Sequence, residues 1–453
     1  MEEFSHDPSE KDTTVMGKLF YENIFLLLLV IAAYFASYSL NLILANMLEP
    51  VDYGDISLVL SVFMFCTPVI LLGTEVSVVH YLPKYLSEKD FSHAHGFLRW
   101  SFELVFAIAS LVFLVSSFVV FLSMIIASKE VGFERWHIYV YSIWLIPIFG
   151  INIQFASLFQ ALKHSYLSTS FNGLNGIVIT ALACMSMSIF WYSYSGEWFG
   201  RDQLRFSVIL IFATVFAVCA LIQYLIGRRF VPKEVWDSEP LMRRPEWFSM
   251  SYKMLISGLI FTALMAIDIV MIRLLSKNQT DVGYFASIMV IAQAMYVFGG
   301  AVNMVVGPLV NEYASSNDRS HLQTVVNWMN FYKMIPGTLF FFIALIFGKD
   351  LLALFGKGFP AAYESLVVLS IGVYVGLAFN AAGTLMVYSK HQMLNFFISL
   401  SQLVMIIVGD ILVIPTFGLF GACVVFSSAI LISSLARAFF VRKEMGIRVL
   451  FIV

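Results

Sequence analysis

Residues 84–93 read KYLSEKDFSH, and residues 312–321 read EYASSNDRSH, 228 positions later. Five of the ten aligned positions are identical, namely Tyr85/Tyr313, Ser87/Ser315, Asp90/Asp318, Ser92/Ser320 and His93/His321. Shared composition alone does not explain this agreement, because most of these residues are polar in a chain that is 60% hydrophobic. The match therefore suggests that the chain contains an internal repeat.

Two further matches occur at nearly the same offset and in the same order along the chain. At an offset of 229, Asp52 and Gly54 in VDYG align with Asp281 and Gly283 in DVGY. At 227, the residues that align are Lys163, His164 and Leu167 with Lys390, His391 and Leu394. Each match falls in an equivalent connection of its half, so the sequence predicts two homologous halves.

The composition places these halves in a membrane. Only 12% of the 453 residues are charged, about half of the roughly 25% that soluble domains carry. A soluble protein this apolar could not cover its own core, which excludes a cytosolic enzyme and a nucleic-acid-binding module. Four cysteines lie in apolar runs without CxxC spacing, so we interpret them as small buried hydrophobic residues.

Long apolar runs give the number of crossings. A bilayer core of about 30 Å takes about 20 helical residues to cross. We predict twelve spans, at approximately 20–47, 55–82, 97–127, 137–162, 168–191, 204–226, 250–275, 283–310, 322–347, 361–388, 393–413 and 417–441. Residues 1–15 are polar and acidic, unlike a signal peptide, so we expect the first span to be retained.

The distribution of basic residues predicts the orientation. Seventeen Lys and Arg residues, Arg437 among them, fall on the side of the termini, and eight fall on the opposite side. By the positive-inside rule, both termini are predicted to be cytoplasmic. Six spans per half is an even number, so the halves enter the membrane in the same sense, as a parallel pseudo-two-fold repeat.

We therefore predict an all-α integral membrane protein of two six-helix bundles. The expected regions are a cytoplasmic N-terminal tail at 1–19, bundles at 20–227 and 249–441, a cytoplasmic linker at 228–248, and a cytoplasmic C-terminal tail at 442–453. The linker contains three prolines and five basic residues. Its charges fit either a solvated loop or a contact with anionic lipid headgroups.

Several short motifs resemble a known family. They are EPVDYG at 49–54, Asp268 followed by VGYFAS at 282–287, KHSYL at 163–167, and IPTFGLFGAC at 414–423. In this order they resemble the polysaccharide transporters, of the O-antigen flippase type, within the multidrug/oligosaccharidyl-lipid/polysaccharide (MOP) exporter superfamily. The resemblance covers nearly the whole chain.

The resemblance implies a function and partners. It implies a V-shaped, MATE-like pair of bundles that flips oligosaccharide linked to polyprenyl pyrophosphate across the bacterial inner membrane. The expected mechanism is alternating access coupled to an ion gradient, for surface polysaccharides such as lipopolysaccharide O-antigen. Expected partners are the lipid-linked oligosaccharide, membrane lipid and polysaccharide polymerase or assembly proteins. We expect a monomer with no cofactor and no nucleic-acid partner.

Ionisable residues inside the spans are the candidate site residues, because a charge at mid-bilayer costs about 2.5–3.5 kcal/mol. They are Glu75, Glu103, Lys253, Asp268, Arg273, Lys333 and Asp410. We predict that Lys253, Lys333 and Arg273 bind the substrate and that Asp268 and Glu75 couple transport to an ion. The alternative is that these charges pair within the bundles, that Lys253 and Glu103 extend to the interface, and that Arg273 only marks the outer interface.

Amides within the spans are a second group of candidates, because an unpartnered amide is costly in an apolar medium. Of these, Asn41, Gln293 and Asn380 are predicted to bind the glycan, although Asn303, Gln154 and Gln402 share the same character. The alternative for each is a hydrogen bond between helices. Tryptophans near span ends are interpreted as interfacial belt residues: Trp136, Trp191, Trp198 and Trp247.

Three other functions were compared with flipping. No GxxxxGK[ST] phosphate loop occurs, which argues against a built-in ATPase, and we predict no catalytic residues and no metal site, His93 and His95 included. A glycan ligase or polymerase would need a long extracytoplasmic loop, and the sequence offers none. A proton- or sodium-coupled antiporter of drugs or metabolites from the same superfamily remains the alternative.

Overall fold

The computed structural model describes residues 24–127, 143, 145–193, 201–315, 319–387 and 391–450, all of them helices or their connections. The first half contains α2 (Ile24–Met47), α3 (Pro50–Leu71), α4 (Thr74–Ser87), α5 (Phe91–Ala127), α7 (Leu145–Ala161), α8 (Ser165–Ser170), η1 (Gly173–Asn175), α9 (Ile177–Ser193) and α10 (Arg201–Phe230). The linker contains α11 (Lys233–Asp237). The second half contains α12 (Arg244–Leu275), α13 (Asp281–Ser315), α14 (Arg319–Ile346), α15 (Gly348–Ala353), η2 (Phe359–Ala362), α16 (Tyr363–Val387), α17 (Gln392–Phe440) and the π-helical turn η3 (Val441–Met445). The predicted tail at 1–19, Trp136, Trp198 and the start of the fourth span lie outside the described residues.

The described helices match the twelve predicted spans. Eight are long and apolar enough to cross a membrane, and three shorter apolar helices are Leu145–Ala161, Ile177–Ser193 and Asp281–Val297. One of the eight, Gln392–Met445, has 54 residues and is long enough for two crossings. The eight long helices, the three shorter ones and this additional crossing make twelve.

The division of α17 follows from its sequence. Pro415 lacks a backbone N–H, and Gly418 adopts a positive φ of 56° with ψ at −136°, which no helix contains. A Cβ on Gly409 would lie 2.6 Å from Val425 Cγ1, so the segments before and after Gly418 pack against each other and the chain reverses between them. The Asp281 carboxylate accepts a hydrogen bond from the Leu419 N–H at 3.2 Å, which caps the second limb.

The second predicted span is broken rather than continuous. It runs as α3 and α4, separated by Leu72 and Gly73, which have φ values of 48° and 76°. The Leu72 N–H donates to the Pro68 carbonyl at 2.8 Å and ends α3. Gly73 then packs directly on the backbone of α12 at Ser251. Hydropathy cannot detect such a break, because every residue around it is compatible with lipid.

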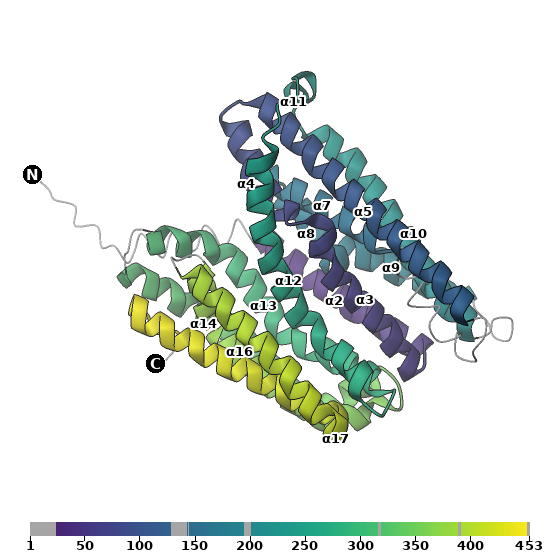
Figure 1. Cartoon of the computed structure of the whole chain (residues 1–453). Coiled ribbons are helices and arrows are strands. Elements are labelled where there is room, and N and C mark those ends of the chain that lie inside the picture. The colour runs from purple at the N-terminus through teal and green to yellow at the C-terminus, as the bar shows by residue number, and fades with distance from the viewer. Residues whose placement is uncertain are drawn as a thin grey trace, which may run out of the picture.

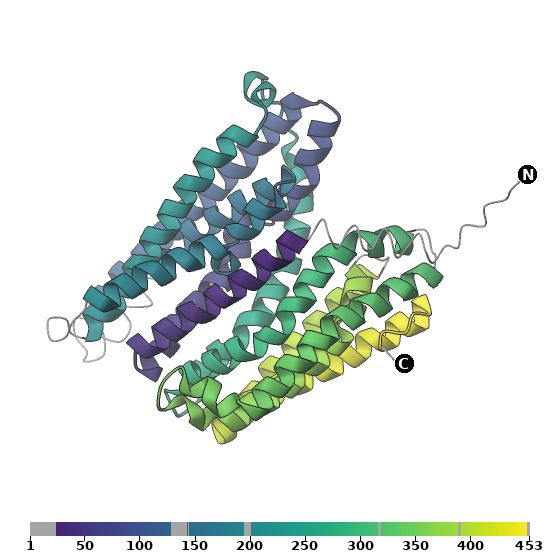
Figure 2. The same cartoon turned by 180° about the vertical axis from the view of Figure 1, so that it is seen from behind.

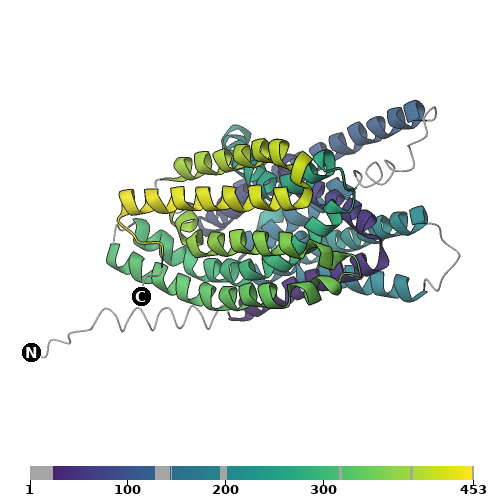
Figure 3. The ribbon, with the colours of Figure 1, turned by 90° about the horizontal axis from the view of Figure 1, so that it is seen from below.

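The helices form two bundles. In Figures 1 and 2, α2–α10 lie in one bundle and α13–α17 in the other, while α12 crosses from the first to the second. The bundles approach each other at the turns between α2 and α3 and between α12 and α13, called here the closed end. They diverge toward the terminus end, where α2 begins and α17 ends. Figure 3 shows from below that the green and yellow helices run side by side as one bundle.

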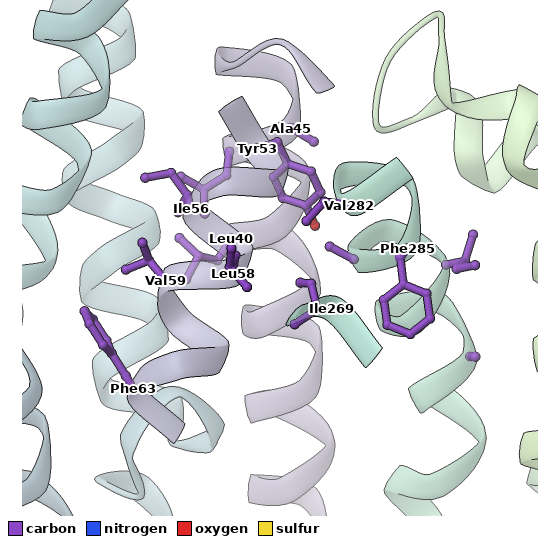
Figure 4. Close-up of a cluster of buried hydrophobic side chains, with 14 of the residues drawn as sticks. Leu40, Ala45, Tyr53, Ile56, Leu58, Val59, Phe63, Ile269, Val282 and Phe285 are labelled. Carbon is purple, nitrogen blue, oxygen red and sulfur yellow. The ribbon is translucent and has the colours of Figure 1, made fainter. Parts of the chain in front are cut away.

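The buried core has the same shape. One cluster joins both halves, and Figure 4 shows Tyr53 of α3 beside Val282 of α13, whereas Ile56 and Phe63 point to the other side of α3. Two smaller clusters lie toward the terminus end, one between Val302 and Val449 of the second half and one within the first bundle together with linker residues such as Trp247. A shared core at one end and separate cores at the other make the V-shaped pair of bundles.

Ring contacts confirm the repeat. The rings of Tyr85 and His93 stack with centroids 5.6 Å apart, and those of Tyr313 and His321 stack at 5.4 Å. These are the residues that align at an offset of 228. The duplicated motif therefore builds the same turn in each half.

The VDYG and DVGY motifs locate the pseudo-two-fold axis. A Cβ on Gly54 would lie 2.6 Å from the Gly283 backbone nitrogen, so these repeat-related glycines touch each other. Two equivalent residues can be in contact only where the symmetry axis passes between them. Asp52 pairs with Arg205 at the start of the sixth span, and Asp281 caps Leu419 at the start of the twelfth.

Candidate functional site

A pair of buried carboxylates lies within the second bundle. Asp268 of α12 is 2% exposed and Asp410 of α17 is fully buried. Their charges interact, yet Asp268 Oδ1 and both carboxylate oxygens of Asp410 have no hydrogen-bond partner among the described residues. Asp268 was a predicted coupling residue, and the structure adds Asp410, which the sequence had marked only as an intramembrane charge.

The surroundings of this pair are apolar. One turn before and after Asp268 lie Leu264 and Ile272, and Ile406 and Ile414 occupy the same positions around Asp410, all four in the buried core. The buried thiol of Cys423 is close enough for both carboxylates to act on it. Two adjacent negative charges are costly in such an environment. The pair can therefore hold a proton or a cation.

A second polar group in the same bundle is formed by Lys333, Asn303 and Asn380. Lys333 is fully buried, and its Nζ has no hydrogen-bond partner in the described part of the chain. The Nδ2 of Asn303 donates to Asn380 Oδ1 at 2.9 Å, which leaves Asn303 Oδ1 without a partner. Both predicted residues, Lys333 and Asn380, thus belong to helices α14 and α16 of one bundle.

The register of the helices places Lys333 and Asn303 at one depth. Gly337 of α14 and Gly299 of α13 both pack against Leu377 of α16. Lys333 and Asn303 each lie four residues, about 6 Å, from these glycines toward the terminus end. The amine and the free amide oxygen therefore lie in the same layer of the bundle.

Arg437 lies next to this layer, because a Cβ on Gly383, three residues after Asn380 on α16, would be 4.0 Å from Arg437 Cδ. Sequence reasoning missed this residue. Its guanidinium donates to four neutral oxygens, at 3.0 Å to Asn395 Oδ1, 2.9 Å to Ser399 Oγ, 3.4 Å to Gln402 Oε1 and 3.5 Å to Ser433 Oγ. No carboxylate of the described residues is among these partners, so all of them leave the positive charge without an opposite charge. The polar positions 395, 399 and 402 share one face of the eleventh span and were the available signal.

The other predicted substrate residues lie elsewhere. Lys253 is exposed on the part of α12 that packs on the first bundle, and Gln293 is exposed on α13. Asn41 donates to the Ser37 carbonyl at 2.8 Å and accepts from the Tyr53 hydroxyl at 2.9 Å, which is the expected alternative of a hydrogen bond between helices. Arg273 forms an ion pair with Asp55 at 3.2 Å near the closed end.

Glu75, the second predicted coupling residue, belongs to the first bundle. It lies in the first turn of α4, directly after the break, and its Oε2 is buried without a hydrogen-bond partner in the described ranges. The adjacent Thr74 donates to Gln154 Oε1 at 3.0 Å. The structure therefore does not bring Glu75 and Asp268 together.

Glu103 and Trp247, the remaining residues singled out in the sequence, have structural roles. Glu103 accepts from Arg99 at 2.7 Å, and both side chains are about half exposed, as expected for pairing within a bundle. The interpretation of Trp247 as a belt residue is wrong, because it is fully buried and its Nε1 donates to the Tyr85 hydroxyl at 3.0 Å. The linker folds back on the first bundle, where the Leu241 N–H donates to the Ser92 carbonyl at 3.0 Å.

Comparisons with known proteins agree with this architecture. A family model described as polysaccharide biosynthesis protein matches residues 20–313. The capsular polysaccharide biosynthesis protein CapF of Staphylococcus aureus is 20% identical over 271 residues, which make up 60% of this chain and 67% of that protein.

Solved structures share the fold. An inward-facing multidrug resistance MATE family transporter of the MOP superfamily superposes with a TM-score of 0.73 at 13% identity, covering 91% of this chain and 94% of that one. A variant of the Vibrio cholerae MATE transporter VcmN gives 0.64 at 13% identity, with 96% and 98% covered. A MOP superfamily transporter of Pyrococcus furiosus gives 0.59 at 12% identity, with 92% and 95% covered.

The family match covers more than half of the chain, and the structural matches cover nearly all of it. Together with the twelve apolar spans, these matches assign both family and fold. The chain belongs to the polysaccharide biosynthesis protein family and is a multi-pass membrane protein with the fold of the MOP transporter superfamily.

Proposed function

We propose that this protein is a flippase that moves oligosaccharide linked to polyprenyl pyrophosphate across the bacterial inner membrane by alternating access. The observation that carries the proposal is the layer formed by Lys333, Asn303, Asn380 and Arg437. It contains two basic side chains without a carboxylate partner in the described residues. Charged groups inside a membrane are costly and mark substrate or ion pathways, so two such positive charges favour an anionic substrate.

The chemistry of the layer suits a pyrophosphate. A guanidinium binds phosphate oxygens through two parallel hydrogen bonds, and an ammonium contributes a point charge. The amides of Asn303 and Asn380 offer both donors and acceptors to sugar hydroxyls. We assign the pyrophosphate to Lys333 and Arg437, and the first sugar to the amides.

The shape supports entry of the substrate from the cytoplasm. The bundles diverge toward the terminus end, which the excess of basic residues assigns to the cytoplasm. This state would accept a lipid-linked glycan that is assembled on the cytoplasmic leaflet. The opposite state would release it on the outer side of the inner membrane. Both termini would stay in the cytoplasm in either state.

Coupling to an ion gradient is assigned to the pair of Asp268 and Asp410. A proton or cation that neutralises the pair changes the charge buried in the second bundle, and such a change can favour one conformation over the other. Glu75 is a second candidate in the first bundle, where its unpartnered oxygen could take up a proton.

The test is binding of a polyprenyl diphosphate to the purified protein in nanodiscs. We expect saturable binding of the diphosphate lipid, and loss of at least about tenfold in affinity for Lys333→Gln or Arg437→Gln, because a charged hydrogen bond contributes about 1.5–3 kcal/mol. Arg437→Lys keeps the charge but loses the paired geometry, so it should retain part of the affinity. Arg99→Gln, which removes an exposed ion pair, serves as the matched control and should bind normally.

A drug or metabolite antiporter is the second candidate, favoured by the acidic pair that a cationic compound could neutralise. The same nanodiscs would then bind a cationic dye such as ethidium, with Asp268→Asn and Asp410→Asn weakening it. Dye binding combined with no binding of the diphosphate lipid would overturn the flippase proposal.

A further inference from the structure

Two carboxylates of α3 reach in different directions at the closed end. Asp52 and Asp55 are each 1% exposed, and each forms an ion pair with an arginine. The partner of Asp52 is Arg205 of α10, in the same bundle. The partner of Asp55 is Arg273, at 3.2 Å, in the outer part of α12 that packs on α17. Only the second pair joins the two bundles.

The pair between the bundles lies beside the glycine contact at the pseudo-two-fold axis. Gly54 precedes Asp55 and touches Gly283, so the two backbones are too close there for a side chain or water between them. The Asp55 carboxyl is therefore held in the interface, while the Arg273 side chain is 19% exposed. Opening this end would separate the glycines and the charges together.

The repeat shows that the fold itself does not require Asp55. At the offset of 229, Asp52 and Gly54 align with Asp281 and Gly283, but Asp55 aligns with Tyr284. The second half builds the same turn without a carboxylate at this position. The extra acid of the first half therefore has a role that the turn does not explain.

We infer that the ion pair of Asp55 and Arg273 is a latch that holds the closed end shut and must break each time that end opens. While the end is closed, the Asp55 carboxylate and the Arg273 guanidinium attract each other across the interface. When it opens, water replaces the partner of each group. Removing either charge removes this attraction between the bundles in the closed state only, so the closed state is destabilised relative to the open one.

The experiment measures the conformation directly, without a substrate. Spin labels are placed at Tyr192, 90% exposed on α9 of the first bundle, and at Lys277, exposed in the turn after α12, in a chain whose four native cysteines are replaced by alanine. Double electron–electron resonance then reports their distance in nanodiscs. Asp55→Asn should raise the population at the longer distance, relative to the population at the shorter distance, about 5- to 150-fold. This is the usual range for a coupling free energy.

Further variants separate a latch from general destabilisation. Arg273→Gln should shift the distances in the same direction, and Arg273→Lys should shift them less. The exchanged pair, Asp55→Arg with Arg273→Asp, should restore the short distance. If Asp55→Asn does not fold, the arginine variants still decide the result.

Asp281→Asn is the matched control. Asp281 is a buried carboxylate at the same end, but its partners Ser276, Asn278 and Leu419 all belong to the second half. We expect a lower melting temperature and an unchanged distance distribution. Asp52 is less suitable, because Arg205 is close enough to Arg273 for their charges to repel.

Two results would overturn the latch. One is an unchanged distance distribution in both Asp55→Asn and Arg273→Gln, and the other is an equal shift in Asp281→Asn. Neither result depends on what the protein transports, so a failure of the flippase proposal would appear in lipid binding and not in these distances.

Discussion

Alanine replacements at two repeat-related glycines are predicted to have opposite effects on stability. Gly73 and Gly300 are 227 positions apart, an offset found in the repeat. Gly73 has φ at 76°, and a Cβ there would lie 2.8 Å from the Leu255 backbone nitrogen. Gly300 lies within the helix α13, and a Cβ there would meet nothing within 4 Å.

The magnitudes follow from these environments. A non-glycine residue in the left-handed region costs about 1–2 kcal/mol, and overpacking against a neighbour adds about 1–3 kcal/mol. Gly73→Ala should therefore destabilise the protein by about 2–5 kcal/mol. Gly300→Ala should stabilise it by about 0.5–1 kcal/mol, because alanine loses less backbone entropy in a helix.

The assay is thermal unfolding in detergent at one fixed scan rate, followed by intrinsic tryptophan fluorescence, because unfolding of large proteins is often irreversible. The apparent midpoint should fall for Gly73→Ala and rise for Gly300→Ala. A wild-type midpoint for Gly73→Ala would refute the close packing of the α3–α4 break on α12. A lower midpoint for Gly300→Ala would refute the open space beside Gly300 in the helix α13.

Three further predictions use other buried groups. Asp268→Asn and Asp410→Asn should each make transport into proteoliposomes insensitive to an imposed proton or sodium gradient, and a normal gradient response in either variant would exclude that residue from coupling. Trp247→Ala should lower stability by about 3–5 kcal/mol, whereas Tyr85→Phe should cost about 1 kcal/mol by losing one hydrogen bond; equal melting shifts would contradict this difference. Cys423, fully buried, should react with a membrane-permeable maleimide only after unfolding, as mass spectrometry of the labelled protein would show.

Hydropathy and the repeat predicted the fold because both depend on local sequence. A span needs only a sufficient run of apolar residues, and duplicated loops such as those of His93 and His321 keep their contacts in both halves. The predictions fail where a residue finds a partner far along the chain. Trp247 is an amphipathic residue near the end of a span, as interfacial residues are, but the linker folds it into a buried cluster.

The candidate site was only partly predictable for the same reason. Transfer costs identify Asp268 and Lys333 as residues that need an explanation, but they do not identify neighbours. Asp410 lies 142 positions after Asp268, and no periodicity connects them. Arg437 was counted on the cytoplasmic side because the positive-inside rule counts charges at span ends without asking which helices surround them.

The acidic pair and the latch lie on one helix, which allows them to influence each other. Asp268 and Arg273 are five residues apart on α12, about 7.5 Å along its axis and about 140° around it. Asp268 meets Asp410 of the second bundle, whereas Arg273 meets Asp55 of the first. A shift or rotation of α12 that follows neutralisation of the pair would therefore move Arg273 relative to Asp55. Because such coupling is reciprocal, Asp268→Asn should change the distance between labels at Tyr192 and Lys277, and its effect should not add to that of Asp55→Asn. Simple additivity of the two shifts, expressed as free energies, would show that the ion site and the closed end act independently.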